Sequence, residues 1–430
     1  MRVVVEGLWH LGCVTAAALA SMGHEVVGFD RDEATVDALC KGVAPVFEPG
    51  LAALIAEGLA ASRLSFVSNE AQLPANVDVL WVAYDTPVDE HDVADVAWVR
   101  AQVRRTLPAL GANTTVLISS QLPVGSTRSL AGDAAVLRPG DHPTFAASPE
   151  NLRLGKALDV FLKPDRVIVG IDHPRDRGRI ASLLAPITDR IEWMSIESAE
   201  MTKHAINAFL ATSVVFANEI ATICEVVGAD AKEVERGLKS EQRIGPSAYV
   251  SPGGAFAGGT LARDIEYLKA IGTDHELTVP LLGAVRTSND QHKTWVRRRL
   301  ATIFPRLAGK VVVVWGLRYK VDTDTLRRSL SVELCEWLLE MGATVRVHDA
   351  RVAALPSAWS GRVERFDDAR ASLVGADVLL IGTESPEYRA IEGIAEAAPG
   401  LTVLDANRFL RPLQSEPSIR YIAVGTPTTI

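Results

Sequence analysis

The sequence predicts an α/β protein in which two Rossmann-like domains, each with a doubly wound parallel sheet, are joined by a long central helical connector. Two βαβ patterns and one long apolar stretch lead to this prediction. The patterns open at Met1 and at Gly309, and each passes from a β-branched strand through a glycine turn and a helix to a second strand that closes on an aspartate. Residues 197–227 keep an apolar helical period between them. We therefore expect an N-terminal domain over residues 1–195, a central helical domain over 196–302 and a C-terminal domain over 303–430.

Length, charge and cysteine content narrow the class of protein. At 430 residues the chain is too long for a single hydrophobic core, and its net charge of −9 argues against a bulk nucleic-acid partner. The chain opens as a strand and has no uncharged apolar run of about 18 residues, so we expect no secretory leader, no membrane association and a cytoplasmic location. Its four cysteines have no metal-like spacing, so we expect buried free thiols and no metal site.

The first βαβ pattern carries part of a dinucleotide-binding fingerprint. Its first strand leads into Gly7 and Gly12, and its second strand closes on Asp30. In this fold the first glycine makes the tight turn, the third lets the helix pack on the strand, and the acid accepts the ribose hydroxyls. The middle glycine, which lets the backbone approach the pyrophosphate, is replaced by Trp9. An indole there would occupy or cover the pyrophosphate site, so the pattern predicts the fold but a weakened NAD site.

Two loops are placed to meet a ligand. Thr86 and Gln121 each lie just after the carboxyl end of an expected strand, and doubly wound sheets bind ligands at that edge. The alternative is that both are Pro-containing loops without a ligand. The expected strands of this half, beyond the first two, are 79–83, 115–118, 145–147 and 167–170, and the expected helices are 32–41, 51–60 and 96–107.

The central apolar stretch carries two polar residues on one face. Lys203 and Asn207 are four residues apart, so they lie together on the predicted helix. A lysine in such a place is most often a surface residue with its stem against apolar neighbours, and it becomes a functional candidate only where that face meets a ligand. His204 is expected to serve packing.

A glycine-rich stretch follows the central helix. It reads Ser251-Pro-Gly-Gly-Ala-Phe-Ala-Gly-Gly-Thr-Leu-Ala-Arg-Asp264, with a helix expected from Ile265 onward. Closely spaced glycines let a backbone approach a ligand. The alternative is a flexible loop, and composition alone does not decide between the two.

Taken in order, the motifs of the chain resemble those of the UDP-glucose/GDP-mannose dehydrogenase family of NAD-dependent nucleotide-sugar dehydrogenases. The resemblance covers essentially the whole length, and although each motif is short, their joint order is specific. The matching segments are residues 7–12, 48–50, 86–87, 123–125, 148–153, 163–166, 198–203, 207–211, 218–220, 243–245 and 316–324.

The resemblance implies an enzyme that oxidises a sugar alcohol twice, to a carboxylate, through an aldehyde and a cysteine thioester, with two NAD molecules reduced in turn. Lys203 and Asn207 match the family's oxyanion-stabilising pair, and Asp264 matches its aspartate. Glu150 matches the glutamate that the family links to water activation. The residues implied to contact the cofactor are Gly7, Trp9, Leu11, Gly12, Asp30, Thr86 and Gln121.

Other family positions are not kept. The nucleophilic cysteine falls on Thr260, whose hydroxyl has a much higher pKa than a thiol and is a poor nucleophile. The family has a Pro-Glu-Phe-Leu-Arg-Glu motif, whose first glutamate matches Glu150 and whose second glutamate falls on Leu154. The family threonine that helps to order water falls on Gln121. The lysine before Asp264 is Arg263. Together with Trp9, these losses imply degenerate active-site and cofactor-loop motifs, because they affect the covalent four-electron reaction as a set.

The nucleotide-sugar end is better kept. The resemblance implies a UDP-sugar ligand, contacts to it and to a neighbouring subunit in the C-terminal block of Lys320, Asp324 and Arg327, and a homodimer through the central helix. The remaining residues implied near the substrate are Arg243, Tyr249 and Gly258.

Three functions stay open from the sequence. The first is an NAD-dependent sugar-nucleotide oxidoreductase with altered chemistry, which stops at the aldehyde or runs as a two-electron oxidation or reduction. The second is a catalytically silent homologue that keeps the fold and a nucleotide-sugar pocket. The third is an ordinary UDP-glucose 6-dehydrogenase, which would need an unseen replacement for the thiol.

Overall fold

The computed structural model describes residues 1–87, 89, 94–150, 152–257, 259–321, 323, 325–390 and 392–427. Contacts between Cα atoms divide the chain into two compact units, Met1–Ile206 and Asn207–Ile430, and the long helix α8 runs through the boundary. Each unit is described by itself. The division into 1–195, 196–302 and 303–430 stays a prediction.

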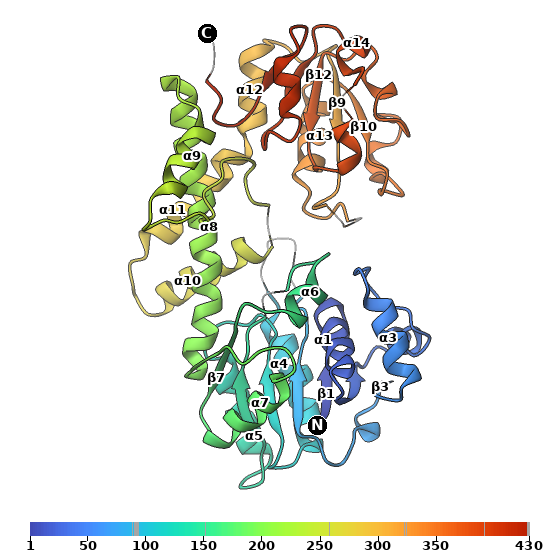
Figure 1. Cartoon of the computed structure of the whole chain (residues 1–430), viewed down its shortest axis with the longest axis vertical. Coiled ribbons are helices and arrows are strands. Elements are labelled where there is room, and N and C mark those ends of the chain that lie inside the picture. The colour runs from blue at the N-terminus through green and yellow to red at the C-terminus, as the bar shows by residue number, and fades with distance from the viewer. Residues whose placement is uncertain are drawn as a thin grey trace. The chain divides into compact units, whose positions relative to one another are not determined.

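The first unit is built around one eight-stranded sheet, in the order β3-β2-β1-β4-β5-β6-β7-β8. Helix α1 packs on β1, β2 and α3 (Figure 1). The elements are β1 (Arg2–Glu6), α1 (His10–Ser21), β2 (Glu25–Phe29), α2 (Glu33–Cys40), α3 (Leu51–Ala60), β3 (Leu64–Val67), β4 (Val79–Val82), α4 (Val96–Thr106), β5 (Thr115–Ile118), α5 (Ser126–Leu137), β6 (Thr144–Ala147), α6 (Ala157–Leu162), β7 (Val167–Ile171), α7 (Pro174–Leu184) and β8 (Ile191–Met194), with short 3-10 turns at Glu70–Gln72 and Leu107–Ala109.

The second unit holds a helical part and a six-stranded parallel sheet, in the order β11-β10-β9-β12-β13-β14. Its elements, with α8 given in full, are α8 (Ile196–Val227), α9 (Ala231–Ser240), α10 (Thr260–Asp274), α11 (Pro280–Lys293), α12 (Trp295–Ile303), β9 (Val311–Trp315), α13 (Leu330–Glu340), β10 (Thr344–His348), β11 (Val363–Arg365), β12 (Val378–Ile381), α14 (Ile394–Ala397), β13 (Thr402–Leu404) and β14 (Arg420–Ile422), with 3-10 turns at Ser357–Trp359, Ala371–Leu373, Pro386–Arg389 and Arg411–Ser415.

The predicted α/β class, with two mainly parallel sheets and a long central helix, is confirmed. The apolar strands β4 and β5 are buried throughout, as expected where helices cover both faces of a sheet. One detail differs: β7 pairs with β6 in the antiparallel sense. The sequence reading also missed four strands, β3, β8, β11 and β14, because these lie toward the sheet edges and carry polar side chains that weaken the hydrophobic signal.

Two expectations from composition need correction. Cys13, Cys224 and Cys335 are buried, but Cys40 is exposed at the end of α2. In addition, α8 is long and apolar enough to cross a membrane by length and composition alone, with a mean hydropathy of 1.5 in a window that is 39% buried. We had expected no membrane-spanning segment because Lys203 and Glu219 interrupt the apolar run of this helix. The core helix of a globular protein passes the same test.

Candidate functional site

The turn after β1 brings three backbone segments into very close approach. A Cβ atom on Gly7, whose φ is +94°, would lie 2.6 Å from the ring of Tyr84, and a Cβ on Gly12 would lie 1.7 Å from the carbonyl oxygen of Gly7. Both positions therefore require glycine. The helix α1 can begin directly after the turn, with its N-terminus at the carboxyl edge of the sheet.

Asp30 stands beside this turn at the end of β2. Its carboxylate accepts the amide of Leu8 at 2.7 Å and the amide of Asp32 at 3.0 Å, and the residue stays partly exposed. The two amides fix the orientation of the carboxylate while leaving it within reach of a ligand. This is the arrangement that a ribose hydroxyl requires.

Trp9 does not distort the turn, although it replaces a glycine. Its φ of −88° and ψ of −150° are ordinary extended values for a residue with a side chain, and the indole is 52% exposed. The backbone can therefore form the turn, and the indole remains on the surface at the N-cap of α1. Whether it covers a bound pyrophosphate stays a prediction.

The sequence analysis missed Asp85, an acid at the same helix N-terminus. Its Oδ2 lies 3.4 Å from the amide nitrogen of Leu11, in the first turn of α1. A carboxylate there carries the same sign of charge as a cofactor pyrophosphate and competes for the same helix end. The signal was available, because Asp85 directly precedes Thr86 in the loop that follows β4.

Thr86 and Gln121 follow the neighbouring strands β4 and β5, and the structure brings them into contact. The Thr86 hydroxyl donates to the carbonyl oxygen of Gln121 at 2.8 Å. Gln121 also lines a small cavity of about 20 Å³, together with Lys203 and His204. His204 is buried, and its Nε2 lies 3.0 Å from the carbonyl oxygen of Leu122, in line with a packing role.

Lys203 and Glu150 meet in the first unit. The Lys203 ammonium donates to the backbone carbonyl oxygen of Glu150 at 2.5 Å, so this lysine is held by the fold and is not a loose surface side chain. Burial raises the pKa of the Glu150 carboxyl, and the charge of Lys203 opposes that shift. Leu154, which stands at the position of the missing second glutamate, is 40% exposed.

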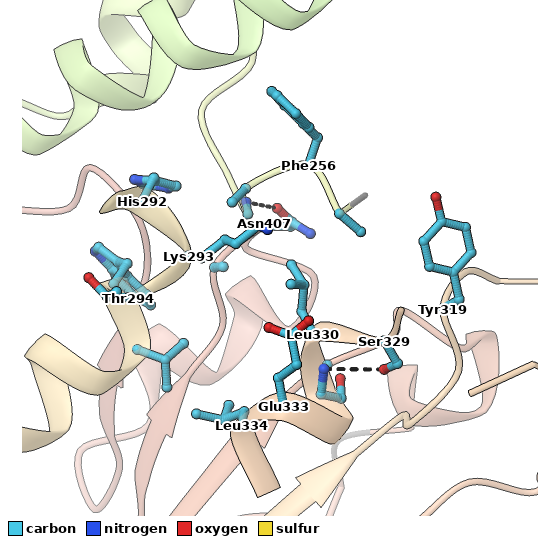
Figure 2. Close-up of a pocket in the computed structure, with 18 of the residues that line it drawn as sticks. Phe256, His292, Lys293, Thr294, Tyr319, Ser329, Leu330, Glu333, Leu334 and Asn407 are labelled. Carbon is cyan, nitrogen blue, oxygen red and sulfur yellow. Dashed lines mark hydrogen bonds between the residues drawn. The ribbon is translucent and has the colours of Figure 1, made fainter. Parts of the chain in front are cut away.

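The glycine-rich loop of residues 251–264 is held by side chains over its first half, which decides against a flexible loop for that segment. Asn218 accepts the amide of Gly253 at 2.9 Å, and Asn407 accepts the amide of Gly254 at 2.7 Å (Figure 2). Burial lowers the pKa of His292, so its neutral ring donates from Nε2 to the Gly253 carbonyl at 2.8 Å.

A second anchor follows three residues later in the loop. Asn289, which is 1% exposed, accepts the amide of Phe256 at 3.0 Å and donates to its carbonyl oxygen at 2.8 Å. A Cβ on Gly253 would lie 2.2 Å from Asn407 Oδ1, so the glycine is needed for this docking. The sequence analysis missed these anchoring residues because they come from α8, α11 and the segment after β13.

The second half of the loop becomes helix α10 earlier than predicted. The helix begins at Thr260, not at Ile265, because the backbone turns at Gly259. Thr260 is thus exposed at a helix N-terminus. Asp264 is fully buried and accepts a hydrogen bond from the side-chain amide of Asn207, so the structure joins two of the predicted residues.

A cavity of about 650 Å³ opens in the second unit, between this loop and the carboxyl edge of the sheet. Tyr249 and Lys320, which the family resemblance implies near the substrate, both line it, and their contact with a substrate stays a prediction. Phe256, Tyr319 and Asn407 line it as well (Figure 2). Burial lowers the pKa of the Lys320 ammonium, which therefore gains from an anionic partner.

The other predicted substrate residues do not line this cavity. Arg243 has an 88% exposed side chain that pairs with Glu241 at 2.9 Å, and Arg327 is exposed. Gly258 and Asp324 lie outside the described residues. Within the described part of the chain, no group of three or more His, Cys, Asp and Glu side chains could hold a metal ion.

The first unit fits a dinucleotide at the adenosine end. Gly7 and Gly12 allow the tight turn, and Asp30 is oriented for a ribose. Asp85 lies near the amide of Leu11 at the start of α1, and Trp9 leaves the backbone of the turn intact.

Comparison with known proteins agrees with this geometry. Three models of the UDP-glucose/GDP-mannose dehydrogenase family match the chain: the NAD binding domain over residues 1–188, the central domain over 197–291 and the UDP binding domain over 313–412. The chain is 33% identical to a UDP-glucose 6-dehydrogenase of Pseudomonas aeruginosa, with 99% of this chain and 98% of that protein covered. It is 31% identical to the UDP-glucose 6-dehydrogenase of Rhizobium meliloti, with 99% of this chain and 100% of that protein covered.

Among solved structures, a UDP-glucose dehydrogenase from Pyrobaculum islandicum superposes with a TM-score of 0.87 at 29% identity, covering 99% of this chain and 98% of that one. The matched NAD binding domain and these relatives indicate that the cofactor is NAD, and the matched UDP binding domain supports a nucleotide-sugar ligand. The chain belongs to the UDP-glucose/GDP-mannose dehydrogenase family.

Proposed function

We propose that the protein is an NAD-dependent oxidoreductase that acts on a CH–OH group of a nucleotide sugar, of the UDP-glucose kind, without a covalent thioester step. The observation that carries this proposal is the side chain at the start of α10. Thr260 stands there where the resemblance places a cysteine. A hydroxyl cannot supply a thiolate, so the aldehyde stage has no covalent route to the carboxylate.

No cysteine elsewhere is a suitable substitute. Cys13, Cys224 and Cys335 are buried, and burial raises the pKa of the Cys13 thiol to about 12. Cys40 is exposed, but it ends α2, away from the glycine-rich loop in the sequence and in the other unit. A two-electron oxidation, or the reverse reduction, needs no thiol.

The retained residues suit hydride transfer. Bound NAD would accept the hydride that leaves the alcohol carbon. Lys203 and Asn207, one turn apart on α8, are the candidates for stabilising negative charge on the substrate oxygen. The Glu150 carboxyl, with its raised pKa, is the candidate for moving the hydroxyl proton, and Asp264 positions the Asn207 amide.

The cavity in the second unit supports a nucleotide-sugar substrate. Its size of about 650 Å³ suits a ligand of that class. Tyr249, Phe256 and Tyr319 offer apolar faces to a base or sugar, and Lys320 offers a cation to a diphosphate.

The test is product analysis with NAD and a panel of nucleotide sugars. The proposal predicts an aldehyde-level product, trapped with hydroxylamine, and one NADH for each sugar oxidised. Thr260→Cys and Thr260→Ser form a matched pair, since only the first supplies a thiol. Formation of UDP-glucuronate with two NADH by the unmodified protein would show an ordinary UDP-glucose 6-dehydrogenase instead.

A catalytically silent homologue is the second candidate. Trp9 and Asp85 at the cofactor turn, together with Leu154, favour it. It predicts that UDP-sugars bind and raise the unfolding temperature while no sugar in the panel yields product. Any turnover with NADH formation contradicts it.

We further propose that the protein is a cytoplasmic homodimer that associates through α8. Phe209, Phe216 and Ile223 are spaced seven residues apart and are 70%, 46% and 57% exposed, so they form one apolar stripe. Such a stripe suits a helix–helix contact. Phe216→Glu should convert the dimer to a monomer in light scattering, whereas Val136→Glu, at another exposed apolar position, should not.

A further inference from the structure

Arg31 directly follows Asp30, the acid whose position at the end of β2 suits a cofactor ribose. In dinucleotide folds such an acid binds the 2′-hydroxyl of NAD, whereas a nearby arginine accommodates the 2′-phosphate of NADP. The Asp30-Arg31 pair is therefore ambiguous in the sequence. The position of the Arg31 guanidinium resolves it.

Every nitrogen of the Arg31 guanidinium is engaged within the first unit. Its Nε donates to Glu70 at 2.8 Å, and its Nη1 donates to Glu6 at 3.1 Å. Its Nη2 donates to the Thr106 hydroxyl at 2.9 Å and lies 2.8 Å from Glu70. Nη1 also approaches Tyr84 and Gln102, at 3.1 and 3.2 Å. A guanidinium has five N–H donors, and these partners use all of them.

Several of these partners lie in the interior of the unit, whereas Glu70 is 29% exposed. Glu6 and Thr106 are fully buried, and the Arg31 side chain is only 14% exposed. The guanidinium carbon lies 4.9 Å from the ring centroid of Phe29, which covers one of its faces. Glu6 in turn accepts the Thr106 hydroxyl at 2.7 Å and the Tyr84 hydroxyl at 3.2 Å. The cluster fixes the Arg31 guanidinium in one arrangement, on Glu6, Glu70 and Thr106.

The charges that remain near the ribose site are unfavourable for a phosphate. Asp30 and Glu70 both contribute carboxyl groups to this part of the unit, and Arg31 is already paired with Glu70. A second cation, Arg105, lies 3.8 Å from Glu70 at the surface of the unit. A 2′-phosphate would thus meet the Asp30 carboxylate without an uncommitted partner from this cluster.

We propose that Glu6 and Glu70 are specificity-determining residues, because they hold Arg31 away from the cofactor and so make the chain reject 2′-phosphorylated dinucleotides. The proposal rests on the NAD binding domain and does not depend on which reaction the protein performs. Its test is therefore binding, measured by the fluorescence of NADH and NADPH with the full-length protein.

The wild-type protein should bind NADH at least about 100-fold more tightly than NADPH. Glu70 is 29% exposed, so Glu70→Gln should fold, release one side of Arg31 and raise NADPH affinity about tenfold with little change for NADH. Glu33→Gln is the matched control, since it removes the same charge from an exposed site in the first turn of α2. Arg31→Gln should not lower NADPH affinity by itself, but it should abolish the gain in the Glu70→Gln background.

Several results would overturn the proposal. One is equal affinity of the wild-type protein for both nucleotides, or no binding of NADH. Another is a loss of NADPH affinity in Arg31→Gln alone, which would mean that Arg31 already reaches the phosphate. The third is a Glu70→Gln variant that behaves like Glu33→Gln. Failure of the proposed two-electron reaction would leave these binding ratios unchanged, so the two ideas fail separately.

Discussion

In the glycine turn after β1 and in the glycine turn after β9, two backbone amides donate equivalent hydrogen bonds. In the first, the amide of Gly7 donates to the Phe29 carbonyl at 2.9 Å, and the amide of Leu8 donates to the Asp30 carboxylate at 2.7 Å. The second repeats both bonds at 2.9 and 2.8 Å, from Gly316 to His348 and from Leu317 to Asp349. The glycine and the aspartate are therefore requirements of the turn itself.

The side chains around the two turns differ in ways that decide ligand binding. In the first turn, Asp30 stays partly exposed and α1 starts at once. In the second turn, the guanidinium of Arg318 pairs with Asp349 at 3.0 Å, with side chains 1% and 0% exposed. The next helix there, α13, begins only at Leu330. The second aspartate is thus paired within the protein, and among the described residues no helix begins at this turn to receive a pyrophosphate.

A glycine turn with a distant aspartate therefore predicts a backbone geometry and not a ligand. Only the carboxylate that remains accessible can select a ribose. Four predictions test this difference, from the largest expected effect to the smallest.

Arg318→Met should have the largest effect on stability. It leaves Asp349 buried without its partner, which costs about 3–5 kcal/mol of unfolding free energy. Urea titration of the full chain measures this loss of unfolding free energy. Arg351→Met is the control, because that side chain is exposed. A loss below about 1 kcal/mol would mean that the pair is not needed to hold the second turn.

Gly12→Ala should damage the first turn. The added Cβ would meet the Gly7 carbonyl at 1.7 Å, so α1 must move, with an expected loss of about 1–3 kcal/mol and weaker NADH binding. Gly132→Ala is the matched control in α5, where the added Cβ meets no atom within 4 Å. That change should be neutral or stabilising by about 0.5–1 kcal/mol. Unchanged NADH affinity in Gly12→Ala would contradict the close approach.

Glu6 makes the first turn sensitive to pH, whereas Trp315, at the matching position of the second turn, does not titrate. Burial raises the pKa of Glu6 above 4.5, so the folded state binds this proton more tightly than the unfolded state does. The contribution of Glu6 to the unfolding free energy is present at pH values below 4.5 and is lost as the pH rises through the raised pKa. Glu6→Gln does not titrate, so its unfolding free energy relative to the wild type should rise across that window. A difference that is flat with pH would contradict the shift.

Asp85→Asn should have the smallest effect, on NADH affinity. Removing the charge near the Leu11 amide should tighten NADH binding by about three- to tenfold, since the pyrophosphate no longer competes with a carboxylate. Asp189→Asn, at an exposed site remote in the sequence, should change nothing. Weaker binding in Asp85→Asn would show that this acid helps to hold the cofactor. Calorimetry measures all three proteins.

Much of the site could be predicted from residue types and order. The polar pair of Lys203 and Asn207 was visible in the sequence, and the family resemblance implied that Thr260 replaces a thiol. Asp30 was also visible at its strand end. What could not be predicted was their partners, such as the Glu150 carbonyl for Lys203, 53 residues away. The start of α10 was also misplaced, because the turn at Gly259 depends on the docked loop that precedes it.

By itself, the sequence determined the two α/β units, the long central helix and the absence of a thiol from the glycine-rich loop, since periodicity and residue type are local properties. Only the tertiary structure decided which charged groups form ion pairs within the fold. Arg31 pairs with Glu6 and Glu70, and Asp349 pairs with Arg318, through contacts between residues that are 25 to 39 positions apart in the sequence. Local spacing carries no record of such pairs, because they form only when separate strands and helices pack together.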